Sequence, residues 1–411
     1  MSPKRIVVLG GGFAGLWSAV SAARALALLG IADEDATVTL VNRDAWHCIR
    51  VRNYESDLSA IRVRIDDVLA PVGVKRVEAD VIDVDVDSHR VGLNENGQLH
   101  TLDYDRLVFA LGSQLVRPDI AGLAEHSFDV DRFDGAARLD THLRALAEQP
   151  ASAGRFTVLV VGAGLTGIEV ATEMTQRLGA LVSNAGSSEK VRVILADHCA
   201  SVGSDMGDDA RPVIERALRE LGIETRIGVA VTAIDERGAT LANGETISAS
   251  TVVWCAGMRA SPLTRWLPVE RDASGRLPVD ATMRVEGVRD VFAAGDTASC
   301  LVDDVHRSVM SCQHARPMGR FAGHNAVCDL FDRPLLPLRI DWYVTVLDLG
   351  SCGAVYTQGW NRTVVATGES AKKTKQVINR ERIYPPRSCD RRELFAAAAP
   401  VVQDPPQRYR P

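Results

Sequence analysis

Short apolar runs alternate with amphipathic stretches from the start of the chain. Residues 5–9 are β-branched and aliphatic, apolar positions from Leu16 to Leu26 recur at helical spacing within 15–29, and 37–41 form a second apolar run. The apolar period therefore changes from about 3.6 residues to about 2, as in a helix followed by a strand. This order predicts a strand–helix–strand unit.

The same order of elements returns in the middle of the chain. An apolar run at 156–161 precedes a predicted helix at 167–178, and a strand at 191–195 and a helix at 208–221 follow. The second half therefore predicts another strand–helix–strand unit.

Each unit closes on a buried strand that ends at a glycine. The run 106–111 leads to Gly112, and the run 251–256 leads to Gly257. Together with the repeated order of elements, these endings indicate an internal duplication of architecture.

Two further segments lie outside this repeat. Residues 77–86 and 90–93 predict a small antiparallel set with a turn at 94–97. A short apolar strand at 289–294 then ends at a glycine followed by Asp296, and it belongs to neither unit.

A glycine-rich turn of the form Gly-x-Gly-x-x-Gly follows the first strand of each unit and opens its first helix. Such glycines let backbone N–H groups approach a pyrophosphate at the positive helix N-terminus. The glycines are Gly10, Gly12 and Gly15 in the first turn and Gly162, Gly164 and Gly167 in the second. The pair of turns predicts two bound dinucleotides.

Composition sets the broad class of the protein. A length of 411 residues fits two or three domains. No apolar run approaches the roughly 18 residues that a membrane helix needs, and the chain enters its first strand without room for a targeting peptide. Since the net charge is only -6, nucleic acid is not an expected partner. We expect a cytoplasmic protein.

The eight cysteines form no CxxC pair and show no metal-ligand spacing with histidine. This pattern argues against zinc, iron–sulfur and thioredoxin-like chemistry, so no metal is expected. Most of the cysteines are interpreted as small buried hydrophobic residues. Cys48, near the first turn, is the one weighed for a redox role, although no resolving cysteine is evident.

The order of motifs over about residues 5–360 resembles that of flavoprotein reductases with two dinucleotide sites. Within that group the chain is most similar to the type II NADH dehydrogenases. The finer marks of this resemblance are residues 162–169, 290–298 and 312–317. The resemblance implies FAD and NADH as cofactors, and transfer of hydride from nicotinamide C4 to flavin N5.

The resemblance also implies the domain organisation. It predicts an α/β fold with two Rossmann-like FAD- and NAD-binding domains, the second inserted in the first, and a C-terminal cap. The expected bounds are 1–118 and 275–335 for the FAD domain, 119–274 for the NADH domain, 336–400 for the cap and 401–411 for a disordered tail.

At the FAD site, the amides of Gly12, Phe13 and Ala14 are expected to hold the pyrophosphate. The family usually has a carboxylate at the end of the second strand, yet here Asn42 stands there, followed by Arg43. We expect FAD to be retained with a different adenosine contact. Asp296 is expected to accept hydrogen bonds from a ribityl hydroxyl, with a nearby helix N-terminus favouring its ionised form; its alternative role is a helix N-cap.

At the NADH site, Asp197 ends the corresponding strand. Its carboxylate is expected to face the adenosine 2′-hydroxyl and to favour NADH over NADPH, which His198 could soften. Glu169 resembles the family's carboxylate near the nicotinamide and flavin, and the alternative is a solvated first-turn carboxylate.

Gln313 and His314 open a predicted helix at 312–331, whose N-terminus is expected to face the flavin. Glu169 and Gln313 are the expected catalytic residues. The other residues assigned to cofactor binding are Val81, Gly112, Leu165, Gly257 and Gly295.

The electron acceptor is the least determined partner. Type II enzymes have a second glutamine four positions after the first, but here that position is Pro317, so the quinone contact is in doubt. The basic segment 369–382, followed by apolar residues 394–402, is interpreted either as a lipid-facing patch or as a solvated helix.

The leading hypothesis is an NADH:quinone oxidoreductase, either cytoplasmic or peripheral on the inner face of the cell membrane. A soluble NADH diaphorase or a reductase of a small redox protein is the alternative. A disulfide or sulfide oxidoreductase and a non-enzymatic NADH sensor stand behind these two, and a homodimer stays open.

Overall fold

A parallel sheet is the base of the first unit, and its strands come from both sides of a long insertion in the chain. The computed structural model describes residues 3–186 and 188–408. The strand order is β20-β9-β1-β2-β5. The strands are β1 Lys4–Leu9, β2 Ala36–Asn42, β5 Lys75–Glu78, β9 Arg106–Phe109 and β20 Val291–Ala293. Because β20 pairs with β9 from far along the chain, the residues between them form an insertion.

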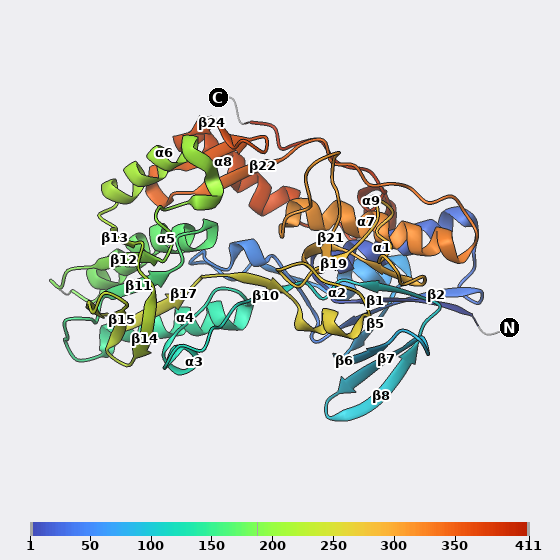
Figure 1. Ribbon diagram of the computed structural model, residues 1–411, viewed down its shortest axis with the longest axis horizontal. Helices are drawn as coiled ribbons and strands as arrows, with labels where there is room; N and C mark the ends of the chain where they lie inside the picture. The colour runs from blue at the N-terminus through green and yellow to red at the C-terminus, as the bar shows by residue number, and fades with distance from the viewer. Residues whose placement is uncertain (1–2, 187, 409–411) are drawn as a thin grey trace.

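Helices α1 (Phe13–Leu29) and α7 (Cys312–Leu330) pack on this sheet and against each other (Figure 1). The contact is close enough to exclude larger side chains. A Cβ at Gly319 would lie 2.2 Å from the Ala14 carbonyl oxygen, and one at Gly323 would lie 2.0 Å from that of Ser18. The start of α7 is therefore held firmly beside the first glycine-rich turn.

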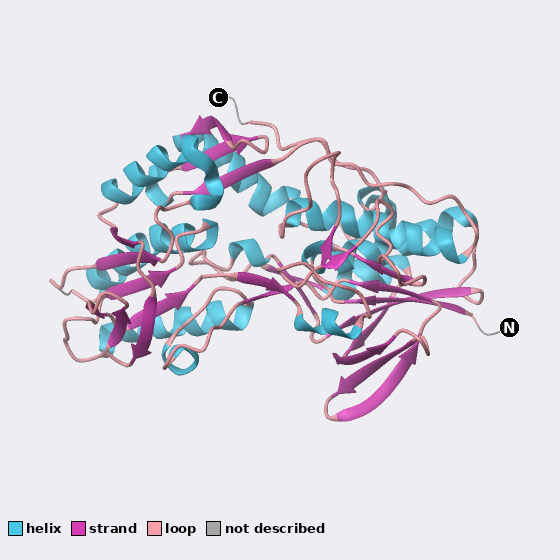
Figure 2. Ribbon diagram, viewed as in Figure 1, coloured by secondary structure: helices cyan, strands magenta, loops and turns pink. Residues whose placement is uncertain are grey.

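The inserted unit repeats the plan of a sheet packed with helices (Figure 2). Its parallel sheet has the strand order β13-β12-β11-β17. Its strands are β11 Thr157–Val161, β12 Arg192–Asp197, β13 Glu224–Ile227 and β17 Thr251–Trp254, and its helices are α4 Phe133–Ala145, α5 Leu165–Asn184 and α6 Gly207–Glu220. The α/β fold with a second Rossmann-like unit inserted in the first is confirmed. The exact boundaries at residues 118, 274 and 335 stay predictions.

Two short antiparallel strands connect the units. β10 (Ser113–Leu115) follows Gly112, and β18 (Met258–Ala260) follows Gly257. Leu115 pairs with Met258 in this ladder. The glycine that closes each parallel sheet thus marks the point where the chain turns into a connection.

The C-terminal residues form an antiparallel sheet of β22 (Val344–Asp348), β23 (Ala354–Gln358) and β24 (Thr363–Thr367), with α8 (Gly368–Val377) packed on it. A π-helical turn (Ile378–Arg382) extends α8. In Figure 1 this sheet lies above α5 and beside α6. The cap therefore reaches the inserted unit from the side on which its helix α5 begins.

Residues 401–408 differ from the disordered tail that the sequence suggested. They have no regular secondary structure, but they pack against the cap. The Trp342 indole N–H donates to the Gln403 carbonyl at 3.1 Å, and the Tyr356 hydroxyl donates to that of Pro406 at 3.0 Å. The rest of the predicted tail, 409–411, lies outside the described residues.

The predicted strand at 77–86 is instead two strands in different sheets. β5 completes the main sheet, where Val77 pairs with Val41, whereas β6 (Asp80–Asp85) opens an antiparallel sheet. Between them the Ala79 amide donates to the Asn42 carbonyl at 3.0 Å, which ends the parallel ladder. Alternation alone cannot reveal such a change of partner.

The shorter elements complete the chain. They are β3 Trp46–Cys48, β4 Arg62–Arg64, α2 Ile65–Leu69, β7 Arg90–Glu95, β8 Gln98–Asp103, α3 Leu123–His126, β14 Val231–Asp235, β15 Gly238–Leu241, β16 Thr246–Ser248, β19 Leu277–Pro278, β21 Ala298–Ser299 and α9 Arg391–Ala397. In the part of the chain that the structure describes, no helix is both long and apolar enough to cross a membrane.

Candidate functional site

A cavity of about 870 Å³ lies where the first unit, the inserted unit and the cap meet. Its walls include the carboxyl ends of strands in the first sheet, which is where ligands bind in open α/β sheets. The predicted site residues that line it are Gly12, Phe13, Ala14, Asn42, Arg43, Gly112, Leu165, Glu169, Gly295, Asp296 and Gln313. One cavity therefore joins the first glycine-rich turn to the start of α5.

The remaining predicted site residues do not line this cavity. They are Gly10, Gly15, Val81, Gly162, Gly164, Gly167, Asp197, Gly257 and His314. Val81 lies on β6 in the separate antiparallel sheet, so its expected contact receives no support from the cavity.

Both glycine-rich turns have a backbone shape that requires glycine. Gly10 and Gly162 adopt φ values of 98° and 108°, which other residues rarely reach. A Cβ at Gly15 would lie 1.7 Å from the Gly10 carbonyl oxygen, and one at Gly167 equally close to that of Gly162. The two turns therefore have the same backbone conformation and the same close approach between their glycines.

Space beside the first turn suits a dinucleotide. A Cβ on Gly12 would meet no protein atom within 4 Å, and Gly12, Phe13 and Ala14 all line the cavity at the N-terminus of α1. That end of α1 has no side-chain cap, so its N–H groups are available to an anionic group. This arrangement fits the pyrophosphate of FAD.

Asn42 acts within the protein. Its side-chain oxygen accepts the Gly11 amide at 2.8 Å, and its NH₂ group donates to the Asp44 carbonyl at 2.9 Å. Asp44 also lines the cavity, and its carboxylate accepts the Trp46 amide at 2.8 Å. Asn42 therefore holds the turn, while Asp44 brings a carboxylate to the cavity two residues later.

Asp197 does the corresponding task in the inserted unit. One carboxylate oxygen accepts the Ala163 amide at 2.5 Å, and the other accepts the Cys199 amide at 2.7 Å. Ligand atoms of Asp197, His198 and Cys199 lie within 4.8 Å of one another, a grouping that the sequence spacing did not suggest. Because backbone N–H groups already bind both oxygens of Asp197, its carboxylate first of all holds the second turn.

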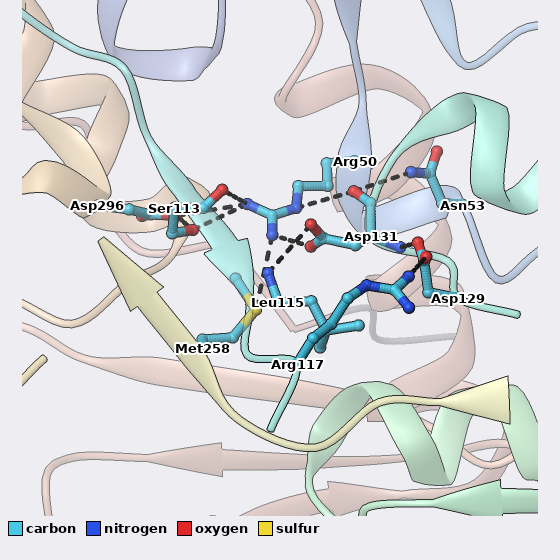
Figure 3. Close-up of polar contacts among 9 residues, drawn as sticks. All are labelled: Arg50, Asn53, Ser113, Leu115, Arg117, Asp129, Asp131, Met258 and Asp296. Atoms are coloured by element: carbon cyan, nitrogen blue, oxygen red, sulfur yellow. Dashed lines mark hydrogen bonds and ion pairs between the residues drawn. The ribbon is translucent and has the colours of Figure 1, made fainter. Parts of the chain in front are cut away.

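Asp296 lies in a 3-10 turn (Gly295–Thr297) at the end of β20. Its carboxylate accepts the Ser113 hydroxyl at 2.6 Å, and Arg50 Nη1 stands 3.8 Å away (Figure 3). Burial raises the pKa of the Asp296 carboxyl, although Ser113 and Arg50 act in the opposite direction. The N-cap role is wrong, because Ala294 is the N-cap of this turn and Asp296 makes no capping bond. The influence of a helix N-terminus stays a prediction, and the first turn of α1 packs beside Gly295, where a Cβ would lie 2.7 Å from that of Ala14.

Arg50 links the two units beside Asp296, and the sequence did not single it out. Its guanidinium donates to the Ser113 hydroxyl at 2.9 Å and to the Asp131 carbonyl at 3.1 Å, and it forms an ion pair with the Asp131 carboxylate (Figure 3). Asp131 also accepts the Leu115 amide at 3.2 Å. One guanidinium therefore joins the first unit, a connecting strand and the start of the inserted unit.

Glu169 is a buried partner of the cap. Lys375 of α8 stands 2.7 Å from its carboxylate, and the Asp348 amide donates to it at 3.1 Å. Burial raises the pKa of the Glu169 carboxyl, against the effect of the Lys375 ammonium. The alternative of a solvated carboxylate is therefore wrong, since Glu169 is only 7% exposed.

Lys372 also points inward, where it pairs with Asp348. Two of the five cations in 369–382 thus serve internal ion pairs. Leu394 and Ala398 of the apolar stretch are buried as well. These two lysines and two apolar residues therefore pack inside the protein and do not belong to the lipid-facing patch that the sequence suggested.

Gln313 and His314 have different surroundings. Gln313 lines the cavity, where its oxygen accepts the Val344 amide at 3.3 Å and its NH₂ group has no hydrogen-bond partner among the described residues. His314 faces away, and its Nδ1 accepts the Val309 amide at 2.8 Å. A donor on Gln313 is therefore left for a bound ligand, which fits a flavin carbonyl.

Two buried histidines predict how stability depends on pH. Burial lowers the pKa of both His47 and His314 from 6.5 to about 4. Between pH 6.5 and 4 these histidines bind protons in the unfolded chain but not in the folded protein. The free energy of unfolding is therefore highest above pH 6.5 and falls as the pH drops toward 4. Each proton contributes about 1.4 kcal/mol per pH unit. We therefore expect the free energy of unfolding, measured with urea, to be about 2–4 kcal/mol lower at pH 5 than at pH 7.5.

The variant His314→Gln isolates one of these protons, because a glutamine oxygen can still accept the Val309 amide. His314→Gln should remove about half of the decrease in unfolding free energy between pH 7.5 and pH 5. His126→Gln, at an exposed position, should leave that decrease unchanged. An identical pH profile for His314→Gln and the parent protein would contradict the assignment.

Comparisons with known proteins agree with this geometry. Residues 4–319 match the model of the pyridine nucleotide-disulphide oxidoreductase family. An NADH dehydrogenase-like protein of Mycobacterium tuberculosis is 57% identical over 402 residues, which cover 98% of this chain and 100% of that protein. A type II NADH:quinone oxidoreductase of Staphylococcus epidermidis is 28% identical, with 93% of this chain and 95% of that protein covered.

The fold is also that of a solved structure. NDH2 from Plasmodium falciparum, determined in complex with NADH, superposes with a TM-score of 0.77 at 14% sequence identity. The match covers 96% of this chain and 97% of that chain.

Proposed function

The chain belongs to the pyridine nucleotide-disulphide oxidoreductase family, and we propose that it is an FAD-dependent NADH dehydrogenase that delivers electrons to a quinone-type acceptor. The observation that carries this proposal is the single cavity bounded by the first glycine-rich turn, the start of α5 and the start of α7. In the overall reaction NADH, one proton and a quinone give NAD⁺ and a quinol.

Residues of the first unit would bind FAD. The amides after Gly12 would hold the pyrophosphate, Asp296 a ribityl hydroxyl, and the free NH₂ group of Gln313 a ring carbonyl. When bound, FAD accepts hydride at its N5 atom. The protein itself orients the two rings and excludes water between the units.

Residues of the inserted unit and the cap would bind NADH. Leu165 and Glu169 bring the start of α5 to the cavity wall, next to Lys375. Since Glu169 is fixed by Lys375 and the Asp348 amide, its carboxylate would present a constant edge to the nicotinamide. Rigid positioning of this kind is the main contribution that hydride transfer requires of a protein.

Disulfide chemistry has little support at this site, although the family name includes it. Cys48 and Cys312 both line the cavity. Burial raises the pKa of the Cys48 thiol to about 11, and it also raises that of Cys312. Both would stay protonated at neutral pH, and a thiol attacks a disulfide only as the thiolate.

An anaerobic NADH titration followed at 450 nm tests the proposal. Loss of the flavin absorbance with about one NADH per site, and its return on addition of menadione, would support an NADH:quinone oxidoreductase. Bleaching without return would exclude menadione as the acceptor but retain the NADH half-reaction. A flavin that NADH does not bleach would overturn the proposal and favour a sensor.

The choice between NADH and NADPH should depend on Asp197. The variant Asp197→Ser removes a charge that repels a 2′-phosphate, so the ratio of kcat/KM for NADPH to that for NADH should rise about tenfold or more. Because Asp197 also holds the turn through Ala163, Asp197→Asn is the matched control that keeps an acceptor oxygen there. An unchanged ratio in both variants would remove Asp197 from nucleotide selection.

A further inference from the structure

The wall of the cavity beyond Gln313 carries buried arginines. Arg316 and Arg320 lie four positions apart on α7, so they project from one face of the helix. Arg316 is 7% exposed and Arg320 is 1% exposed, yet both line the cavity, together with Arg382 of the π-helical turn. Three guanidinium groups therefore border one end of an internal space.

Arg316 and Arg320 lack carboxylate partners among the described residues, whereas the Asp404 carboxylate interacts with Arg382. No ion pair in that part of the chain involves Arg316 or Arg320. Arg320 donates to the Val401 carbonyl at 3.3 Å, and Arg382 donates to the Asp404 carbonyl. Neutral carbonyls cannot balance this charge, and buried cations normally have a counter-charge.

Several of their N–H groups also lack acceptors. Nε of Arg316 and both Nε and Nη2 of Arg320 are buried without a hydrogen-bond partner in the described part of the chain. The Trp17 ring lies 5.7 Å from the Arg316 guanidinium carbon and 5.1 Å from that of Arg320, which provides cation–π contact but no acceptor. Burial lowers the pKa of Arg320 to about 9 and that of Arg316 to about 10, so both stay charged at neutral pH.

The surroundings of the arginines suit a flat apolar group. The same cavity is also lined by Pro317, Trp342, Ile378 and Ile383. Pro317 occupies the position at which type II NADH dehydrogenases have a second glutamine. A neutral polar contact is thus absent at that position, while positive charge stands one residue before it and three residues after it.

We propose that Arg316 and Arg320 bind the anionic group of an aromatic electron acceptor, a carboxylate or sulfonate carried on its ring. The guanidinium groups would supply the charge-assisted hydrogen bonds, and Pro317 and Ile378 would contact the ring. This proposal rests on the proposed function, because it takes the ligand to be the electron acceptor of that reaction. It narrows the acceptor from quinones in general to anionic ones.

The test measures binding with a matched pair of redox-inert probes. Isothermal titration of the FAD-loaded protein should show 2-naphthoate binding at least tenfold more tightly than 2-naphthamide, because only the carboxylate is charged. In Arg320→Met this preference should fall to within twofold. Arg333→Gln removes a charge from an exposed position just after α7 and should leave the preference intact.

A stability measurement separates a binding role from a structural one. Without ligand, Arg320→Met should unfold at a urea concentration equal to or higher than the parent protein, because it removes an unpaired buried cation. A lower midpoint together with an unchanged preference for naphthoate would assign Arg320 to structure and overturn the proposal. Arg316→Gln provides the second variant, and it too should lose the preference.

Steady-state turnover with a charged and an uncharged quinone is the third test of the proposal. In Arg320→Met the KM for 1,4-naphthoquinone-2-sulfonate should rise at least tenfold, while the KM for uncharged menadione should stay within twofold. Equal binding of naphthoate and naphthamide by the parent protein would refute the anion site even if NADH bleaches the flavin. A flavin that NADH cannot bleach would refute the proposed function, and the probe titration would still judge the anion site.

Discussion

The variant Asp296→Ala is expected to fold and to purify with little flavin. Asp296 offers the cavity a carboxylate that Ser113 holds at 2.6 Å, and Arg50 stands at 3.8 Å on its other side. A hydrogen bond from a ribityl hydroxyl to this anion is worth about 1.5–3 kcal/mol, so the Kd for FAD should rise about tenfold to a hundredfold. The ratio of absorbance at 450 nm to that at 280 nm measures the flavin content directly.

Two controls sharpen this experiment. Asp296→Asn keeps an acceptor oxygen and should retain more flavin than the alanine variant. Ser113→Ala removes the hydroxyl that positions the carboxylate and should weaken FAD binding less than Asp296→Ala does. Full flavin content in Asp296→Ala, with a normal far-UV circular dichroism spectrum, would show that FAD does not depend on this carboxylate.

The environment of Asp296 marks the limit of what the sequence could reveal. The motif that ends at Asp296 is local, and its strand was predicted from a short apolar run. Its neighbours Ser113 and Arg50 come from elsewhere, and the hydroxyl of Ser113 lies 183 positions away in the chain. Arg50 donates to the Asp131 carbonyl, which lies 81 positions later in the chain, so no local spacing could predict this contact.

Local patterns served the glycine-rich turns and the helices well. The predicted helix at 312–331 is α7 (Cys312–Leu330), because its start and its apolar period are both written in adjacent residues. The basic segment 369–382 shows the opposite case. Its composition suggested a lipid or solvent surface, yet Lys375 is directed inward by Glu169, whose position depends on how the cap packs on α5.

Asn42 and Asp197 illustrate a role that only geometry could assign. Sequence reasoning treated both as ligands of an adenosine ribose because they end equivalent strands. In the structure each side chain accepts the second amide of its own glycine-rich turn, at 2.8 Å from Gly11 and at 2.5 Å from Ala163. The equivalence of the two positions was real, but its first physical consequence is to hold the turn.

The buried pair of Glu169 and Lys375 should give the largest effect on stability. Glu169→Gln leaves the Lys375 ammonium buried without its nearest carboxylate, and breaking such a pair costs about 3–5 kcal/mol. Lys375→Met leaves the Glu169 carboxylate with the Asp348 amide as its remaining partner among the described residues and should cost a similar amount. Urea unfolding of the FAD-loaded protein, followed by tryptophan fluorescence, measures both losses.

The double variant Glu169→Gln/Lys375→Met decides whether the two residues act as a pair. Since neither charge is then left uncompensated, the double variant should lose at least 1.5 kcal/mol less than the sum of the single losses. The exposed pair of Arg339 and Asp304 is the matched control, and its coupling should stay below about 1 kcal/mol. Additive losses at Glu169 and Lys375 would mean that each residue is held independently, and the cap would then not be joined to the inserted unit through this ion pair.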